Sequence, residues 1–177
     1  MKGTKNCSFG NLLCNISCVF ENILLFYLTE NLLSEVFCYC QSLTEIIVAS
    51  DNAYYTSIDG VLYSEDETLL ICYPAGKANT TFVVPDNVNK VNSSSFNSAK
   101  YLTNVIIPSN VKEIGYDAFN ACDSLTSITI LNPACEISAS GYTIPNSATV
   151  YGYENSTAQE YAERHGRTFV SLDGENP

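Results

Sequence analysis

The chain has 177 residues, of which 19 are acidic and 8 are basic, so its formal net charge at pH 7 is −11. Nucleic acids and anionic membranes bind clustered cations, yet no lysine or arginine lies between Lys5 and Lys77, so the composition argues against both partners. No apolar run approaches the roughly 18 residues of a membrane-spanning helix, and no membrane span is predicted. The length suits a single domain.

The first 35 residues do not fit the pattern of the rest of the chain. Lys2 and Lys5 precede an apolar stretch at 12–20, which Glu21 and Asn22 interrupt. A signal peptide needs an uninterrupted apolar core followed by small residues, and neither is clear here. We therefore expect residues 1–35 to be a degenerate first repeat or a helical cap, because the first coil of a stacked fold requires cover.

A repeated pattern occupies residues 36–140. Residues 83–107 overlay residues 106–130, so that Phe96 recurs 23 residues later as Phe119. A fixed period in the low twenties indicates a solenoid, because one short unit cannot bury its apolar face alone and must stack on its neighbours. The expected fold class is thus a β-rich repeat solenoid with short helical turns.

Each unit contains an alternating apolar segment, which predicts a short strand with one buried face. Parallel strands of one sheet are expected at 43–48, 102–107 and 125–130. The side chains predicted to point inward are Leu43, Ile46, Val48, Leu102, Val105, Ile107, Leu125, Ile128 and Ile130. The register is wrong if Ile128 is more exposed than Thr129.

A turn is expected before the interior aromatic residue of each unit. Gly115 stands there in one copy and Asn92 in another, and both residue types tolerate a positive φ. Phe119 is then predicted to fill the interior of its coil. Cys40 and Cys122 occupy a matching interior position, where a free thiol packs as a small apolar side chain.

The residues between the inward positions should point away from the core and form the candidate binding site. They are Glu45, Ile47, Asn104, Ile106, Ser127 and Thr129. Ile47 and Ile106 would make an apolar strip that continues into Thr129, and contiguous exposed isoleucines indicate a contact surface. The segment inserted at 51–82 could displace Ile47 from Ile106, or it or a neighbouring module could cover both residues.

Residues 51–82 are too many for a simple loop, so the segment should carry structure of its own. Two β-prone runs at 61–63 and 69–73 flank a short polar stretch, which predicts a hairpin. The acids Glu65, Asp66 and Glu67 are consecutive and lack the alternating spacing of a calcium loop, so a solvated turn is expected.

Residues 141–177 are expected to close the solenoid. Ser156 and Gln159 predict a capping box for a helix at 157–165. A final strand at 168–172 would cover the edge of the sheet, because open edges promote aggregation.

No catalytic residue, metal site or cofactor is predicted. The eight cysteines form an even set, which would suit disulfides in a secreted chain, but they show no spacing typical of a disulfide framework. Cys38 and Cys40 are too close for the usual zinc pair. The only histidine, His165, falls in the last turn of the expected helix, where positive charge suits the helix dipole. Neither a Gly-x-Ser-x-Gly motif nor a glycine-rich phosphate loop is present.

Three of these motifs resemble parts of BspA-type leucine-rich repeat proteins. Residues 107–130 are similar to the repeat itself, with the pattern Ile-Pro-x-x-Val-x-x-Ile-Gly-x-x-Ala-Phe-x-x-Cys-x-x-Leu-x-x-Ile-x-Ile. The segment 58–77 resembles a hairpin unit that often interrupts such arrays, and residues 149–162 resemble their closing unit. The resemblance implies a right-handed leucine-rich-repeat coil with a hairpin insert and a helix–strand cap.

The same resemblance implies a bacterial or protist surface protein that binds host or matrix components. We therefore expect a non-enzymatic adhesion module, extracellular or on the cell surface, that recognises a protein or glycoprotein through its sheet. Two alternatives remain open. One is a cytoplasmic interaction scaffold, which the abundant thiols and the lack of a clear signal peptide favour. The other is a spacer module without a ligand of its own.

Overall fold

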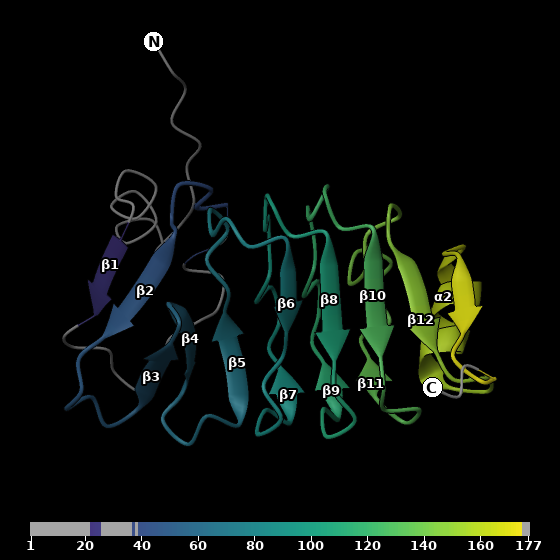
Figure 1. Ribbon diagram of the computed structural model, residues 1–177, viewed down its shortest axis with the longest axis horizontal. Helices are drawn as coiled ribbons and strands as arrows, with labels where there is room; N and C mark the ends of the chain where they lie inside the picture. Colours follow the sequence, from purple (N-terminus) through teal and green to yellow (C-terminus); the bar gives the residue numbers. More distant parts are fainter. Residues whose placement is uncertain (1–21, 26–36, 38, 175–177) are drawn as a thin grey trace, which may run out of the picture.

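The computed structural model describes residues 22–25, 37 and 39–174, and these form a solenoid of short strands whose coils stack side by side (Figure 1). The predicted fold class is confirmed. The degenerate repeat or helical cap expected at 1–35 lies outside the described residues, apart from strand β1 (Asn22–Leu25).

One side of the solenoid is a five-stranded parallel sheet with the strand order β13-β12-β10-β8-β6. In chain order its strands are β6 (Thr81–Val83), β8 (Asn104–Ile107), β10 (Ser127–Ile130), β12 (Thr149–Gly152) and β13 (Phe169–Ser171). The strands predicted at 102–107 and 125–130 are confirmed, although they begin at Asn104 and Ser127. Leu102 and Leu125 are nevertheless fully buried, as expected.

The other side is a six-stranded sheet with the order β11-β9-β7-β5-β4-β3. Its parallel part consists of β5 and three strands of two residues each: β5 (Leu69–Cys72), β7 (Lys90–Val91), β9 (Glu113–Ile114) and β11 (Glu136–Ile137). The antiparallel part consists of β3 (Tyr55–Ile58) and β4 (Val61–Ser64), which extend the sheet from β5.

The hairpin predicted within 51–82 is confirmed as β4 and β5. Strand β3, which pairs with β4 through a tight turn at Asp59 and Gly60, was not predicted. Both turn residues have a positive φ, of 50° and 75°, and Asp-Gly is a favoured pair for such a hairpin. The strand escaped prediction because Tyr55 is its only buried residue, so its sequence shows no apolar alternation.

The prediction that residues 43–48 share a sheet with the other two predicted strands is wrong. Strand β2 (Glu45–Val48) pairs in parallel with β1 and forms a separate two-stranded sheet. The turn between β3 and β4 occupies its other edge, where the Ile46 amide donates to the Gly60 carbonyl at 2.8 Å. Val48, predicted to point fully inward, is only half-buried.

The hairpin divides the apolar core into two clusters. Val61 and Leu70 belong to the larger cluster toward the C-terminus, whereas Leu62 and Ile71 belong to the smaller cluster with Ile46. Both faces of β4 and β5 are therefore buried. This explains why the two strands are continuous apolar runs rather than alternating ones.

Aromatic rings stack along the interior of the larger cluster. The ring centroids of Tyr73 and Phe96 lie 5.2 Å apart, and those of Phe96 and Phe119 lie 4.7 Å apart. Phe119 is fully buried, as predicted. The predicted register is also confirmed, because Ile128 is fully buried while Thr129 remains partly exposed.

The backbone conformation predicted at Gly115 and Asn92 is wrong. Neither residue has a positive φ; Ser94 and Asp117, two positions further along, have φ values of 55° and 52°. Gly115 is required for space instead, because a Cβ there would lie 2.5 Å from the backbone nitrogen of Ser93 in the preceding coil.

The C-terminal cap matches its prediction. Helix α2 (Thr157–His165) begins after Ser156, whose hydroxyl accepts a hydrogen bond from the Gln159 amide at 3.3 Å, and it ends at Gly166 with φ 65°. Strand β13 then pairs with β12 and adds the last strand to the sheet. Within the described part of the chain, no helix has the length and apolar character needed to cross a membrane.

Candidate functional site

The candidate site lies on the outer side of the five-stranded sheet. Successive residues of a strand point to opposite faces, and the inward positions of these strands pack against the larger core cluster. The strand register therefore places nine side chains outward, and we call them the sheet face. They are Thr81, Val83, Asn104, Ile106, Ser127, Thr129, Thr149, Tyr151 and Val170.

The nine side chains form two rows that run across the strands. The middle row crosses all five strands and consists of Val83, Ile106, Thr129, Tyr151 and Val170. The other row consists of Thr81, Asn104, Ser127 and Thr149. Val83 and Val170 at the two ends of the middle row are 53% and 38% exposed, while its inner members are half-buried between neighbouring strands.

The structure brings together four of the six predicted site residues, namely Asn104, Ile106, Ser127 and Thr129. The other two, Glu45 and Ile47, lie in β2 and hence in a different sheet. Ile47 does point outward, with 40% of its surface exposed, but the predicted apolar strip from Ile47 to Ile106 does not exist. The hairpin of β4 and β5 lies between β2, which carries Ile47, and β8, which carries Ile106, as Figure 1 shows.

Sequence reasoning missed three members of the middle row. Val83 could have been found, because the 23-residue overlay places it on Ile106. Tyr151 and Val170 could not, because the coils that carry them differ in length from the regular repeat, so the overlay ends before β12 and β13.

The sheet face contains no aspartate, glutamate, lysine or arginine, although the chain carries a net charge of −11. In the two-residue strands β7, β9 and β11 of the opposite sheet, the outward positions are Lys90, Glu113 and Glu136, which the register places side by side. Lys90 and Glu113 form an ion pair at 2.8 Å. The sheet face therefore offers apolar contacts and hydroxyl or amide hydrogen bonds, whereas the opposite sheet offers charge.

The acidic turn of the hairpin has a structural role. Asp66 accepts hydrogen bonds from the Ser64 hydroxyl at 2.6 Å and from the Thr68 hydroxyl at 3.0 Å. The bond from Ser64 is the main cause that lowers the pKa of Asp66 below its usual range. In the part of the chain that the structure describes, no three histidine, cysteine, aspartate or glutamate side chains lie close enough to hold a metal ion.

The thiols in the core are packing residues. Cys40 and Cys122 are fully buried, as predicted for their interior positions. Burial raises the pKa of Cys122 and of Cys135 from 9.0 to about 12. Because the thiolate is the nucleophilic form, neither of these two side chains is suited to covalent catalysis at neutral pH.

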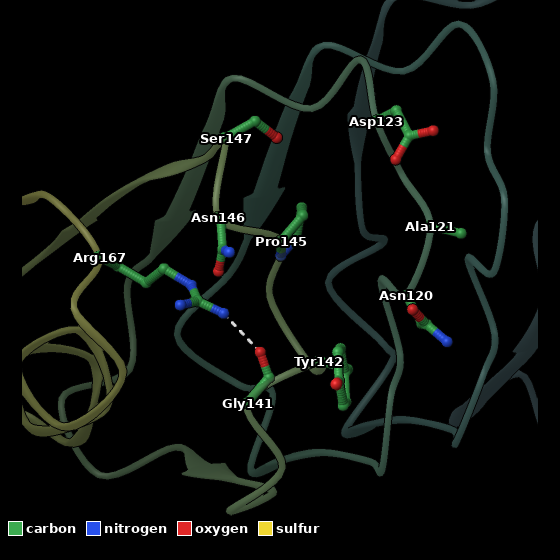
Figure 2. Close-up of a pocket in the computed structure, with 9 residues that line it drawn as sticks. All are labelled: Asn120, Ala121, Asp123, Gly141, Tyr142, Pro145, Asn146, Ser147 and Arg167. Carbon is green, nitrogen blue, oxygen red and sulfur yellow. Dashed lines mark hydrogen bonds between the residues drawn. The ribbon is translucent and has the colours of Figure 1, made fainter.

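A cavity of about 490 Å³ opens beside the N-terminal ends of β10, β12 and β13 (Figure 2). It is lined by Asn120, Ala121, Asp123, Gly141, Tyr142, Pro145, Asn146, Ser147 and Arg167. The guanidinium of Arg167 donates to the carbonyls of Gly141, Ile144 and His165, which fixes the position of its side chain.

Three solved structures share this fold. A leucine-rich cell surface protein from Faecalibacterium prausnitzii is 19% identical, with a TM-score of 0.57, and the match covers 87% of this chain and 48% of that one. The pneumococcal vaccine antigen PcpA is 20% identical, with a TM-score of 0.54 and coverage of 85% and 55%. A leucine-rich repeat protein from Eubacterium ventriosum is also 20% identical, with a TM-score of 0.52 and coverage of 76% and 42%. The chain thus spans about half the length of these proteins.

The family comparison agrees with the repeat seen in the coils. Residues 73–158 match the model of the BspA type leucine rich repeat region in six copies. The matched part runs from the end of the hairpin through the regular coils to the first residues of α2, and it includes strands β6, β8, β10 and β12 of the sheet face. No curated protein matches the chain. Residues 73–158 are a BspA-type leucine-rich repeat region.

Proposed function

We propose that this chain is a non-enzymatic binding module of a surface or secreted leucine-rich repeat protein, and that its sheet face recognises a protein or glycoprotein. One observation carries the proposal: the middle row is uncharged and partly apolar, and it runs across five strands of an otherwise acidic chain. Side chains on a rigid sheet lose little entropy on binding, which favours such a surface for recognition.

The repeat family supports the same function, since leucine-rich repeat solenoids generally serve as interaction modules rather than as enzymes. Two structural neighbours are a cell surface protein and a vaccine antigen, which supports an extracellular location. Contacts of this kind would use shape and hydrogen bonds rather than charge, because the sheet face carries no ionic side chain.

The size of the sheet limits how a partner can bind. Five strands spaced about 4.8 Å apart span roughly 19 Å, and four residues along a strand span roughly 13 Å. The resulting area of roughly 250 Å² is well below the roughly 800 Å² that each partner buries in a standard protein–protein interface. A partner must therefore also contact the loops that flank the sheet, with the middle row at the centre of its footprint.

A charge placed in the middle row tests the proposal. Wild-type protein and the variants Ile106→Asp and Val83→Asp would be measured against immobilised extracellular-matrix proteins and serum glycoproteins. Each variant should weaken binding about 100-fold, because an unpaired carboxylate would be desolvated in the interface. Tyr116→Asp is the matched control, since Tyr116 is 59% exposed in the turn after β9, and it should bind like the wild type.

Both face variants should keep the circular dichroism spectrum of the wild type, because neither side chain belongs to the core clusters. If well-folded Ile106→Asp and Val83→Asp bind as tightly as the wild type, the partner site lies elsewhere, and the hairpin at 51–82 becomes the first candidate. Failure of the wild type to bind any member of the panel would contradict the proposed function itself.

The cytoplasmic scaffold is a second candidate, and the free, buried thiols of Cys122 and Cys135 favour it because reduced cysteines persist in the cytosol. Fractionation of the native cells separates the two readings. Recovery of the protein from the cell surface or the medium is the expected result, and recovery only from the cytosol would favour the scaffold.

A further inference from the structure

The cavity beside the five-stranded sheet has a lining that the proposed function does not use (Figure 2). Three successive coils contribute to it: residues 120–123 precede β10, residues 141–147 precede β12, and Arg167 lies between α2 and β13. In the view of Figure 2, Asn146 and Arg167 stand on one side, Asn120 and Asp123 on the other, and Tyr142 below them.

Three planar polar side chains in this lining are available to a ligand. Asn120, Asp123 and Asn146 form no side-chain hydrogen bond with any described residue. The two amides each offer a donor and an acceptor in one plane, and the carboxylate offers two acceptors. A ligand with neighbouring hydroxyl groups can donate to and accept from such groups at the same time.

An aromatic ring lies at the same cavity. Tyr142 is 69% exposed, more than any other large hydrophobic side chain that the structure describes. Its backbone is held in place, because the Tyr142 amide donates to the Ser140 hydroxyl at 3.2 Å and that hydroxyl donates to the carboxylate of Asp117. The ring therefore stands on a fixed backbone and presents open surface to a ligand.

The charge around the cavity disfavours an anionic ligand. The guanidinium of Arg167 already donates to the carbonyls of Ile144, Gly141 and His165, including two bonds to Ile144 at 3.1 and 2.9 Å. These carbonyl dipoles offset its charge and occupy most of its five N–H donors. The carboxylate of Asp123 and the net charge of −11 repel anions further.

We propose that this cavity binds a neutral saccharide. The apolar C–H face of a pyranose ring would pack on Tyr142, and its hydroxyl groups would pair with the side chains of Asn120, Asp123 and Asn146. The volume of about 490 Å³ suits a mono- or disaccharide and lies within the range of roughly 300–1,000 Å³ found for small-molecule sites. The inference does not depend on the sheet face, because none of its nine residues lines the cavity.

Titration of the ¹⁵N-labelled protein tests the proposal. The probes are glucose, galactose, mannose, fucose, N-acetylglucosamine and N-acetylgalactosamine, each raised to about 50 mM, because one sugar in an open site is expected to bind with a Kd of about 1–10 mM. At least one sugar should shift the amide signals of residues 120–123, 141–144, 146 and 147. Tyr142→Ala should weaken the binding of that sugar about fivefold, which corresponds to the stacking energy of about 1 kcal/mol on an aromatic ring.

Tyr116→Ala is the matched control, because it removes another exposed tyrosine that does not line the cavity, and it should leave the sugar affinity unchanged. Asn146→Ala is a second variant, and it should also weaken binding. Ile106→Asp should have no effect on the sugar, so a failure of this site and a failure of the sheet face are distinguishable.

Three outcomes would overturn the proposal. The first is that none of the six sugars shifts the cavity signals. The second is that Tyr142→Ala binds the sugar as tightly as the wild type. The third is that inorganic phosphate or glucuronic acid binds the cavity more tightly than every neutral sugar, which would make it an anion site centred on Arg167.

Discussion

The two sides of the solenoid come from the same repeat but present different surfaces. Their inward positions are alike, and both bury aliphatic side chains such as Val105 in the five-stranded sheet and Ile114 in the six-stranded sheet. Their outward positions differ, since Thr129 and Ile106 stand on one side where Glu113 and Lys90 stand on the other. Packing therefore constrains the interior of both sides, and the outward residues are free to serve binding.

The largest loss of stability is expected from a substitution in the core that the two sides share. Phe119→Ala should lower the free energy of unfolding by about 3–5 kcal/mol, because the buried ring stacks on Phe96 and leaves a cavity when removed. Urea denaturation measures the change, with the exposed Tyr116→Ala as control. If both variants unfold at the same urea concentration, Phe119 does not support the core.

A smaller loss is expected where one coil touches the next. Gly115→Ala should destabilise the protein by about 2 kcal/mol, because the new Cβ would meet the Ser93 backbone and force neighbouring coils apart. Ser138 occupies the matching place in the following coil and already has a Cβ, so Ser138→Ala should be nearly neutral. Equal stability of the two variants would mean that the coils have room to adjust.

Alkaline pH should lower the free energy of unfolding of the wild-type protein. The thiols of Cys122 and Cys135 have a pKa of about 12 in the fold and near 9.0 when exposed. Between these values the unfolded chain loses protons that the folded chain keeps, so stability falls as pH rises above about 9. At pH 10 the expected loss is about 1 kcal/mol per thiol.

Urea denaturation at pH 7 and pH 10 measures this loss, and Cys122→Ala should show a shallower decline than the wild type. A wild-type protein equally stable at both pH values would contradict the burial of these thiols. Native-state labelling with a thiol reagent gives an independent check, because Cys122 should react only after unfolding.

The smallest loss of stability is expected at the Lys90–Glu113 ion pair of the six-stranded sheet. Lys90→Ala should cost only about 0.2–1 kcal/mol, because its ion pair with Glu113 is largely exposed to solvent. The loss should shrink further in high salt, which screens the pair. A salt-independent loss of several kcal/mol would show that the charged side contributes to stability as much as the core does.

The regular and the irregular parts of the solenoid differ in how far the sequence could predict them. Regular units such as the one containing Phe119 and Ile128 were predictable, because apolar spacing and burial follow the same period. The placement of β2 could not be predicted. The pattern at Ile46 indicates a strand but not the strand that pairs with it, and in the structure Gly60 of the β3–β4 turn lies at that edge of β2. Tyr151 and Val170 lie in coils whose lengths depart from the period.

The cavity could not be predicted at all. Asn120, Tyr142 and Arg167 come from three coils, and the distances between them along the chain do not follow the repeat. Only the stacked structure places these side chains around one opening. A binding site formed by residues of several coils therefore cannot be identified from a sequence pattern that describes a single coil.

The most direct test of the central claim is hydroxyl-radical footprinting of the protein alone and saturated with the matrix protein or glycoprotein that binds it. Oxidation of Tyr151 in the middle row should fall several-fold in the complex, while oxidation of Tyr116, in the turn after β9, should stay unchanged. Protection of Tyr116 with Tyr151 left fully reactive would contradict the assignment of binding to the sheet face.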